Sequence, residues 1–309
     1  MATAERIQTH DEIEMREWAN QFMAENNMTQ AALARQLGYP NPSALNQFLK
    51  GSYPSPATFV RKLSELRTIS SASKPLHSFG GYVPLSISED IYQTIRAIHL
   101  KGGLAVECGD PGIGKTMAGR KYASDYANNS VLVTVNPSFA TKKNFFKMLC
   151  RACRLPEGPL DEMWYTCVNY FRSGGALKVL IIDEAQHLPA KVIDHIRSMA
   201  DEVSTLGIVF LGNRRLSETM GGRQQLDYAQ LISRTKIRRM RTTAQITLED
   251  AQMLFPEIKE GHALKFILSV AQSQQGLRGA SNLYSNALDR EDTTFEGLVA
   301  MAKHMQMLV

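Results

Sequence analysis

The chain contains the stretch Gly109-Asp-Pro-Gly-Ile-Gly-Lys-Thr116, which matches the phosphate-binding loop pattern G-x-x-x-x-G-K-[ST] at every fixed position. Glycines allow the backbone to approach phosphates closely, and the N–H groups of the loop and of the following helix attract negative charge. In this pattern the lysine reaches the β- and γ-phosphates, and the hydroxyl beside it holds Mg²⁺. The sequence therefore predicts that ATP and Mg²⁺ bind at this loop. The predicted ATP-binding residues are Gly109, Asp110, Pro111, Gly112, Ile113, Gly114, Lys115 and Thr116.

Short apolar runs alternate with helix-permissive runs around this loop, which is typical of a parallel sheet with crossover helices. The first four of these runs are apolar almost throughout, as strands covered on both faces are. The fifth carries several charges, so we expect it at an edge of a five-stranded α/β sheet. The predicted strands are Leu104–Cys108, Val131–Val135, Val179–Asp183, Ile208–Gly212 and Ile237–Arg241.

Composition divides the chain into four parts. A helix-rich segment, 1–69, is followed by a polar linker, 70–84. The predicted nucleotide-binding domain covers 85–245, and 246–309 contains no strand-like run. This last part is predicted to be a helical lid whose first helix starts with the capping-box pattern Thr247-Leu-Glu-Asp250.

Polar side chains follow two other strands of the predicted sheet. Asp183 and Glu184 end one strand, and Asn213 follows the next. Ligands bind at the carboxyl ends of strands in open α/β sheets. Asp183 is therefore predicted to hold Mg²⁺ together with Thr116, and Glu184 to act as the general base for the attacking water. Asn213 lies where an amide can orient that water.

The composition of the chain sets limits on its class. It has 309 residues, is 44% hydrophobic and carries a formal net charge of +5, which permits nucleic-acid binding. There is no apolar run of about eighteen residues and no apolar leader, so we expect a cytoplasmic protein without a membrane segment. The four cysteines are too few for a disulfide scaffold.

The loop, Val179–Glu184, Asn213 and the helical C-terminal part together resemble the AAA+ ATPases. In that family the strand-end asparagine is the first sensor of the γ-phosphate, and an arginine finger reaches the γ-phosphate of a neighbouring subunit. The resemblance places this finger at Arg234, with Arg223 as the alternative. It places the second sensor arginine, early in a lid helix, at Arg278.

Further motifs resemble the phage Mu transposition protein B (MuB) type of AAA+ ATPase, which is related to the IstB-like transposition ATPases. The motifs are Asp183-Glu-Ala-Gln-His-Leu188, Leu211-Gly-Asn-Arg-Arg215, Met220-Gly-Gly222 and Leu231-Ile-Ser-Arg234. This resemblance implies Mg-dependent hydrolysis of ATP to ADP and phosphate, stimulated by DNA and a partner. It implies a homo-oligomeric helical filament on double-stranded DNA without strong sequence preference. It also implies that the protein captures target DNA for a MuA-like phage transposase, activates strand transfer and acts in the bacterial host cytoplasm.

Residues 28–51 resemble a repressor-type helix-turn-helix. Gly38 supplies the turn after the first helix, and 43–49 is the predicted recognition helix. No strong basic stripe is present, so we expect weak or sequence-indifferent DNA binding. A small helical interaction domain that touches only the partner is the alternative. The outward-facing candidates for DNA contact are Ser43, Asn46, Gln47 and Lys50.

Basic groups in the nucleotide-binding part give a second set of DNA candidates. Lys142 and Lys143 open a predicted helix, and Arg151 lies further along it. In AAA+ rings the corresponding region faces the central channel. The densest basic run, 234–241, fits either a subunit or DNA interface or a solvated edge strand protected from aggregation by its charge.

Three other functions are compatible with these motifs. One is a helicase-loader ATPase of the DnaC/IstB type, which would prefer single strands. Another is a nucleotide-regulated helix-turn-helix transcription regulator, which would bind specific operators. The third is a scaffold with an inactive site, although Lys115, Thr116, Asp183 and Glu184 are all present.

Overall fold

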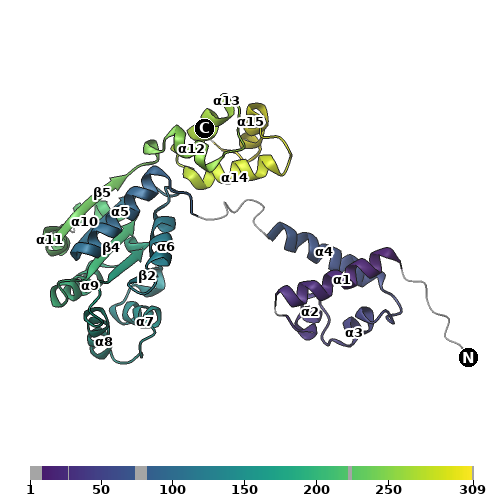
Figure 1. Ribbon diagram of the computed structural model, residues 1–309, viewed down its shortest axis with the longest axis horizontal. Helices are drawn as coiled ribbons and strands as arrows, with labels where there is room; N and C mark the ends of the chain where they lie inside the picture. The colour runs from purple at the N-terminus through teal and green to yellow at the C-terminus, as the bar shows by residue number, and fades with distance from the viewer. Residues whose placement is uncertain (1–8, 27, 74–81, 222–224, 308–309) are drawn as a thin grey trace, which may run out of the picture. The chain divides into compact units, whose positions relative to one another are not determined.

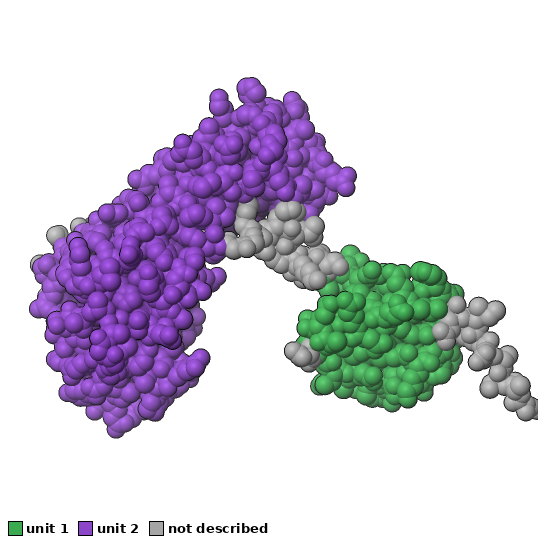
Figure 2. Space-filling model, viewed as in Figure 1, with its two compact units in different colours: residues 1–78 green, residues 79–309 purple. Residues whose placement is uncertain are grey.

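The computed structural model describes residues 9–26, 28–73, 82–221 and 225–307. The chain forms two compact units, residues 1–78 and 79–309 (Figure 2). The nucleotide-binding part and the lid both belong to the second unit. None of the helices in the described ranges combines the length and the apolar character needed to cross a bilayer.

In its described residues, 9–26 and 28–73, the first unit is all-helical and has a core of its own. Thr9 and Thr29 cap two of its helices, each accepting a hydrogen bond from a backbone N–H three residues on. Leu45 and Phe48 are buried, whereas Lys50 is exposed, so the predicted recognition helix has the expected inner and outer faces. The helices are α1 (His10–Glu25), α2 (Gln30–Gln36), α3 (Ser43–Leu49) and α4 (Ala57–Ser73).

The second unit is built on a parallel five-stranded sheet with the order β2-β3-β4-β1-β5 (Figure 1). The predicted α/β fold and the edge position of the fifth strand are confirmed. The residues of β5 are all exposed or half-buried, while β3 and β4 are buried throughout. The strands are β1 (Gly103–Gly109), β2 (Ser130–Thr134), β3 (Val179–Asp183), β4 (Gly207–Gly212) and β5 (Thr235–Arg241).

Helices cover both faces of this sheet because successive strand side chains point to opposite faces. Val179 and Ile181 face the core that holds α5 and α6, whereas Leu180 and Ile182 face the core that holds α7 to α11. The α5–α6 face is formed by α5 (Ser86–Lys101) and α6 (Lys115–Asp125). The opposite face is formed by α7 (Lys142–Ala152), α8 (Leu160–Arg172), α9 (Ala190–Glu202), α10 (Arg214–Gly221) and α11 (Gln225–Arg234). Short 3₁₀ turns lie at η1 (Pro137–Phe139), η2 (Ala185–His187) and η3 (Thr243–Gln245).

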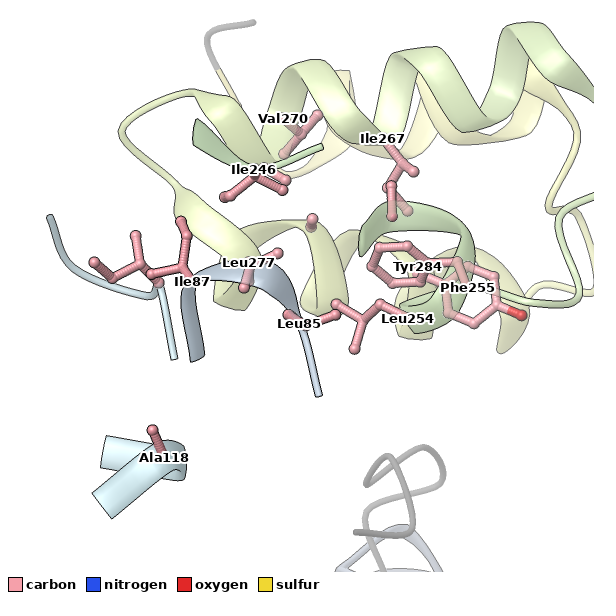
Figure 3. Close-up of a cluster of buried hydrophobic side chains, with 14 of the residues drawn as sticks. Leu85, Ile87, Ala118, Ile246, Leu254, Phe255, Ile267, Val270, Leu277 and Tyr284 are labelled. Carbon is pink, nitrogen blue, oxygen red and sulfur yellow. The ribbon is translucent and has the colours of Figure 1, made fainter. Parts of the chain in front are cut away.

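The C-terminal lid is helical, as predicted, and packs on the start of α5. Leu85 and Ile87, at that start, lie against the lid side chains Leu254 and Leu277 within one hydrophobic cluster (Figure 3). Burial of each such side chain contributes about 1.5–3 kcal/mol relative to exposure. The lid helices are α12 (Leu248–Leu254), α13 (Gly261–Gln272), α14 (Gly276–Leu288) and α15 (Phe295–His304).

A buried carboxylate strengthens this attachment. Asp250 completes the predicted capping box with Thr247 and also accepts hydrogen bonds from the backbone N (2.7 Å) and hydroxyl (2.6 Å) of Ser86. Burial by itself raises the pKa of Asp250, but the hydrogen bonds from Ser86 and Thr247 outweigh it and hold the pKa below its ordinary value. The charged form of Asp250 therefore joins the lid to α5.

Candidate functional site

The phosphate-binding loop joins the end of β1 to the start of α6. Gly114 has a φ of +94° and caps the helix, so that the first N–H groups of α6 point at the loop. Gly109 allows a close approach, because a Cβ there would lie 2.5 Å from Cδ1 of Ile113 and 2.7 Å from the carbonyl oxygen of Arg241. Gly114 thus adopts a backbone conformation that favours glycine, and Gly109 leaves room that a side chain would fill.

Lys115 lies half-buried inside this loop. Its Nζ donates hydrogen bonds to the carbonyl oxygens of Gly109 (2.9 Å) and Asp110 (2.7 Å). Burial lowers the pKa of Lys115, and the nearby carboxylates of Glu184 and Asp183 oppose that shift. A cation with these neighbours is suited to binding phosphate oxygens.

Thr116, at the start of α6, and Asp183, at the end of β3, come together as predicted. The hydroxyl of Thr116 donates to Oδ2 of Asp183 over 2.9 Å. Burial raises the pKa of Asp183, and the charge of Glu184 adds to the effect, while the Thr116 hydrogen bond opposes it. Adjacent hydroxyl and carboxylate oxygens are the ligands that Mg²⁺ prefers, so these two residues fit a magnesium site.

Glu184 follows Asp183 in a left-handed backbone conformation, with φ 57° and ψ 36°. Its Oε2 accepts a hydrogen bond from Nε2 of Gln186. The Oε1 of Gln186 in turn accepts from the backbone N of Asn213 at 3.2 Å. The sequence motifs assign no role to Gln186, and its only signal is its place in the Asp183–Leu188 motif.

Asn213 directly follows β4, which lies between β3 and β1 in the sheet. The loop, Asp183 and Asn213 therefore meet at one edge, as predicted from the strand ends. The Oδ1 of Asn213 is buried and has no hydrogen-bond partner among the described residues. A buried acceptor of this kind fits a site that contains a water or another donor.

The lid contacts the loop directly. The backbone N of Leu277 donates to the carbonyl oxygen of Gly112 at 3.1 Å. A Cβ at Gly276 would lie 2.6 Å from the carbonyl oxygen of Pro111. Arg278 follows in the first turn of α14 with an exposed side chain. The arginine assigned to the second sensor thus belongs to the lid segment that touches the loop.

Asp110 connects the loop to the end of β5 and to η3, which lead into the lid. Its backbone N donates to the carbonyl oxygen of Arg241 at 3.1 Å, and its Oδ2 accepts from the backbone N of Thr243 at 3.0 Å. Arg214 follows Asn213, and its guanidinium lies 3.6 Å from Oδ1 of Asp110. The motif predicts Asp110 as an ATP-binding residue of the loop but does not predict these contacts, because they depend on where β5 and η3 lie.

Arg234 lies at the amino ends of the strands, away from the phosphate-binding loop. It immediately precedes β5, whose Thr235 pairs with Leu104 at the start of β1, whereas Arg241 pairs with Gly109 at the end. The separation along the strands is about 20 Å. Arg234 forms an ion pair with Asp201 of α9. The alternative finger, Arg223, lies outside the described residues.

The DNA-contact candidates fall into separate groups. Lys142 and Lys143 open α7, while Arg151 lies near its other end, about 12 Å away along the axis, and pairs with Glu157 at 2.6 Å. The candidates of α3 belong to the first unit. Of those, Ser43, Gln47 and Lys50 are exposed and Asn46 is half-buried.

Comparisons with known proteins agree with this geometry. A family model described as an AAA domain matches residues 98–220. A DNA transposition protein B of the Mu-like prophage FluMu in Haemophilus influenzae is 26% identical over 270 residues, covering 86% of this chain and 93% of the relative. The ATP-dependent target DNA activator B of Escherichia phage Mu is 30% identical over 203 residues. That match covers 64% of this chain and 63% of the relative, which is less than two thirds of its length.

Two solved structures share the fold. Cdc6p from Pyrobaculum aerophilum has a TM-score of 0.54 at 18% identity, covering 73% of this chain and 69% of that one. The Aeropyrum pernix Orc1 protein, solved in complex with DNA, has a TM-score of 0.53 at 14% identity, covering 74% and 68%. Similarity at this level of identity concerns the fold alone. The chain therefore has the AAA+ P-loop fold, and its sequence is similar to those of the transposition B proteins of Mu and Mu-like phages.

Proposed function

We propose that this protein is an ATP-dependent DNA-binding ATPase that captures target DNA for a phage transposase and activates strand transfer. The observation that carries the proposal is the contact between Thr116 and Asp183, with Lys115 and Glu184 beside it. A relative that is 30% identical over 203 residues is named an ATP-dependent target DNA activator. The complete set of nucleotide-site residues favours an active ATPase over a scaffold.

Hydrolysis follows from the roles that these side chains can take. Lys115 binds the β- and γ-phosphates, and Thr116 and Asp183 hold Mg²⁺, which neutralises phosphate charge when bound. Glu184 accepts a proton from the attacking water, and the amide of Asn213 orients that water. Arg278, on the lid segment that contacts the loop, stabilises charge on the γ-phosphate.

The position of Arg234 supports a site that is shared between subunits. At about 20 Å along the sheet from its own loop, Arg234 is too far away to reach a phosphate bound there. A neighbouring subunit can supply the same side chain in trans. Binding of ATP then favours assembly, and we propose a helical filament on duplex DNA that disassembles after hydrolysis.

Contacts with the DNA backbone account for binding without strong sequence preference. At the start of α7, Lys143 is exposed and Lys142 is half-buried, and phosphate contacts from such side chains carry no sequence information. The α3 surface of the first unit adds weak contacts to DNA or binds the transposase. We also propose that the chain is divided into a helix-turn-helix domain (1–69), a linker (70–84), a nucleotide-binding domain (85–245) and a helical lid (246–309).

Duplex binding measured across a salt series, with and without ATP and Mg²⁺, tests this function. We expect tight binding only with ATP, little difference between sequences, and affinity that falls steeply with salt, by a slope of about 0.9 per phosphate contacted. Preference for single strands would support the helicase-loader function instead, and footprints at one operator would support a transcription regulator. Addition of a cognate transposase should then increase strand transfer into the bound DNA.

A further inference from the structure

Gln186 connects the proposed general base to the neighbouring strand of the sheet. We propose that Gln186 is a positioning residue, which fixes the carboxylate of Glu184 so that one of its oxygens faces the attacking water. This inference rests on the proposed ATPase function and adds a residue that the nucleotide-binding motifs do not include. Gln186 contacts the base and not the reacting atoms.

The orientation of the Gln186 amide is set by the protein backbone. The backbone N–H of Asn213 can only donate, and it lies 3.2 Å from Gln186, so the amide oxygen must face β4. The amide nitrogen then faces the other way and donates to Oε2 of Glu184. Gly212 leaves room for this arrangement, because a Cβ there would lie 3.3 Å from the amide oxygen.

Glu184 is held by Gln186 at an unusual backbone position. It lies between the end of β3 and η2, in a left-handed conformation that a residue with a Cβ adopts rarely. The hydrogen bond from Gln186 occupies Oε2 and leaves Oε1 to accept a proton. A neutral amide orients the carboxylate without neutralising it, whereas a lysine or arginine would reduce its basicity.

The same amide also links the base to the residue that is proposed to orient the water. Gln186 spans the ends of β3 and β4, and its acceptor contact is with the backbone of Asn213 itself. The buried Oδ1 of Asn213 has no partner among the residues that the structure describes. Gln186 therefore fixes the position of Glu184 relative to Asn213. We expect the attacking water to lie between these two residues.

Steady-state ATP hydrolysis by the full chain, in the presence of duplex DNA, tests the proposal through two variants. Gln186→Met keeps the size of the side chain and removes both hydrogen bonds. Gln186→Glu keeps an acceptor for the N–H of Asn213 but places a second carboxylate beside Glu184. The matched control is Gln272→Met on α13, which loses a side-chain hydrogen bond to the carbonyl oxygen of Ile246 (2.7 Å) within the lid.

We expect Gln186→Met to lower kcat roughly 10- to 100-fold, as the loss of one hydrogen bond to a charged group predicts, with KM for ATP unchanged. Gln186→Glu should lower kcat at least as much, again without a change in KM. Gln272→Met should retain the wild-type kcat. Circular dichroism and binding of a fluorescent ATP analogue establish that each variant is folded and binds nucleotide.

A Gln186→Met variant with wild-type or higher kcat overturns the proposal, as does one that changes only KM. Wild-type protein and Glu184→Gln are measured in parallel to separate the two claims. Absence of turnover in the wild type contradicts the proposed ATPase function itself. Normal turnover in Glu184→Gln removes the base that Gln186 is proposed to position.

Discussion

The nucleotide site and the α3 surface of the first unit differ in how their side chains are held. At the nucleotide site, hydrogen bonds connect Lys115, Thr116 and Asp183 to the loop or to one another, and each is at least partly buried. On α3, the predicted DNA contacts are exposed or half-buried side chains around a helix whose apolar face forms the core. Chemistry on a phosphate requires fixed geometry, whereas backbone contacts with DNA do not. The two regions should therefore respond very differently to substitution.

The largest effect is expected for Lys115→Ala, which removes the cation from the loop. ATP binding, measured with a fluorescent analogue, should fall by more than about 100-fold, because a buried charge contact with phosphate is lost. Lys121→Ala is the control, since Lys121 lies on the same helix and pairs with Asp125 at the surface. Equal nucleotide affinity in the Lys115 variant and this control would contradict the site.

The shared site can be tested by mixing subunits. Arg234→Ala should bind ATP normally but hydrolyse it about 10³-fold more slowly, as the loss of an arginine finger predicts. A mixture with Lys115→Ala, which retains Arg234, should be more active than either variant alone. Arg172→Ala, which removes an exposed arginine of α8 paired with Glu202, should leave hydrolysis unchanged. If mixing restores no activity, Arg234 does not act in trans.

Asp250→Asn should weaken the attachment of the lid, lowering the free energy of unfolding by about 1–3 kcal/mol at neutral pH. Because the pKa of Asp250 is lowered in the folded chain, its contribution is complete above the unfolded pKa of about 3.9 and is lost as the pH falls below it. Urea unfolding at pH 7 and below pH 4 measures the difference. Exposed Asp289→Asn is the control, and a difference that grows on acidification would contradict the role of Asp250.

The smallest effects are expected at the DNA contacts. Lys142→Ala and Lys143→Ala should each weaken duplex binding uniformly across sequences and reduce the salt slope by about one. Lys50→Ala should weaken binding less, or only change stimulation by the transposase. A larger loss for Lys50→Ala than for the α7 variants would move the main DNA contact to the first unit.

The same contrast determines how much could be predicted from the sequence. The strands were predicted to within two residues of their ends, because buried parallel strands are continuous apolar runs. The meeting of Thr116 and Asp183 followed from strand ends that share one sheet edge. The contacts of Gln186 with Asn213 and of Asp110 with Thr243 could not be predicted, because each joins segments whose relative placement depends on packing. The burial of Leu45 and Phe48 confirmed the inner face of α3. The exposed side chains of its outer face do not indicate what they bind.

The most direct measurement is electron microscopy of the wild-type protein with duplex DNA, with and without ATP and Mg²⁺. We predict helical filaments on the DNA when ATP is present, none without it, and none with Lys115→Ala under either condition. Filaments of equal abundance without ATP, or with Lys115→Ala, would contradict the claim that the nucleotide site controls assembly on DNA.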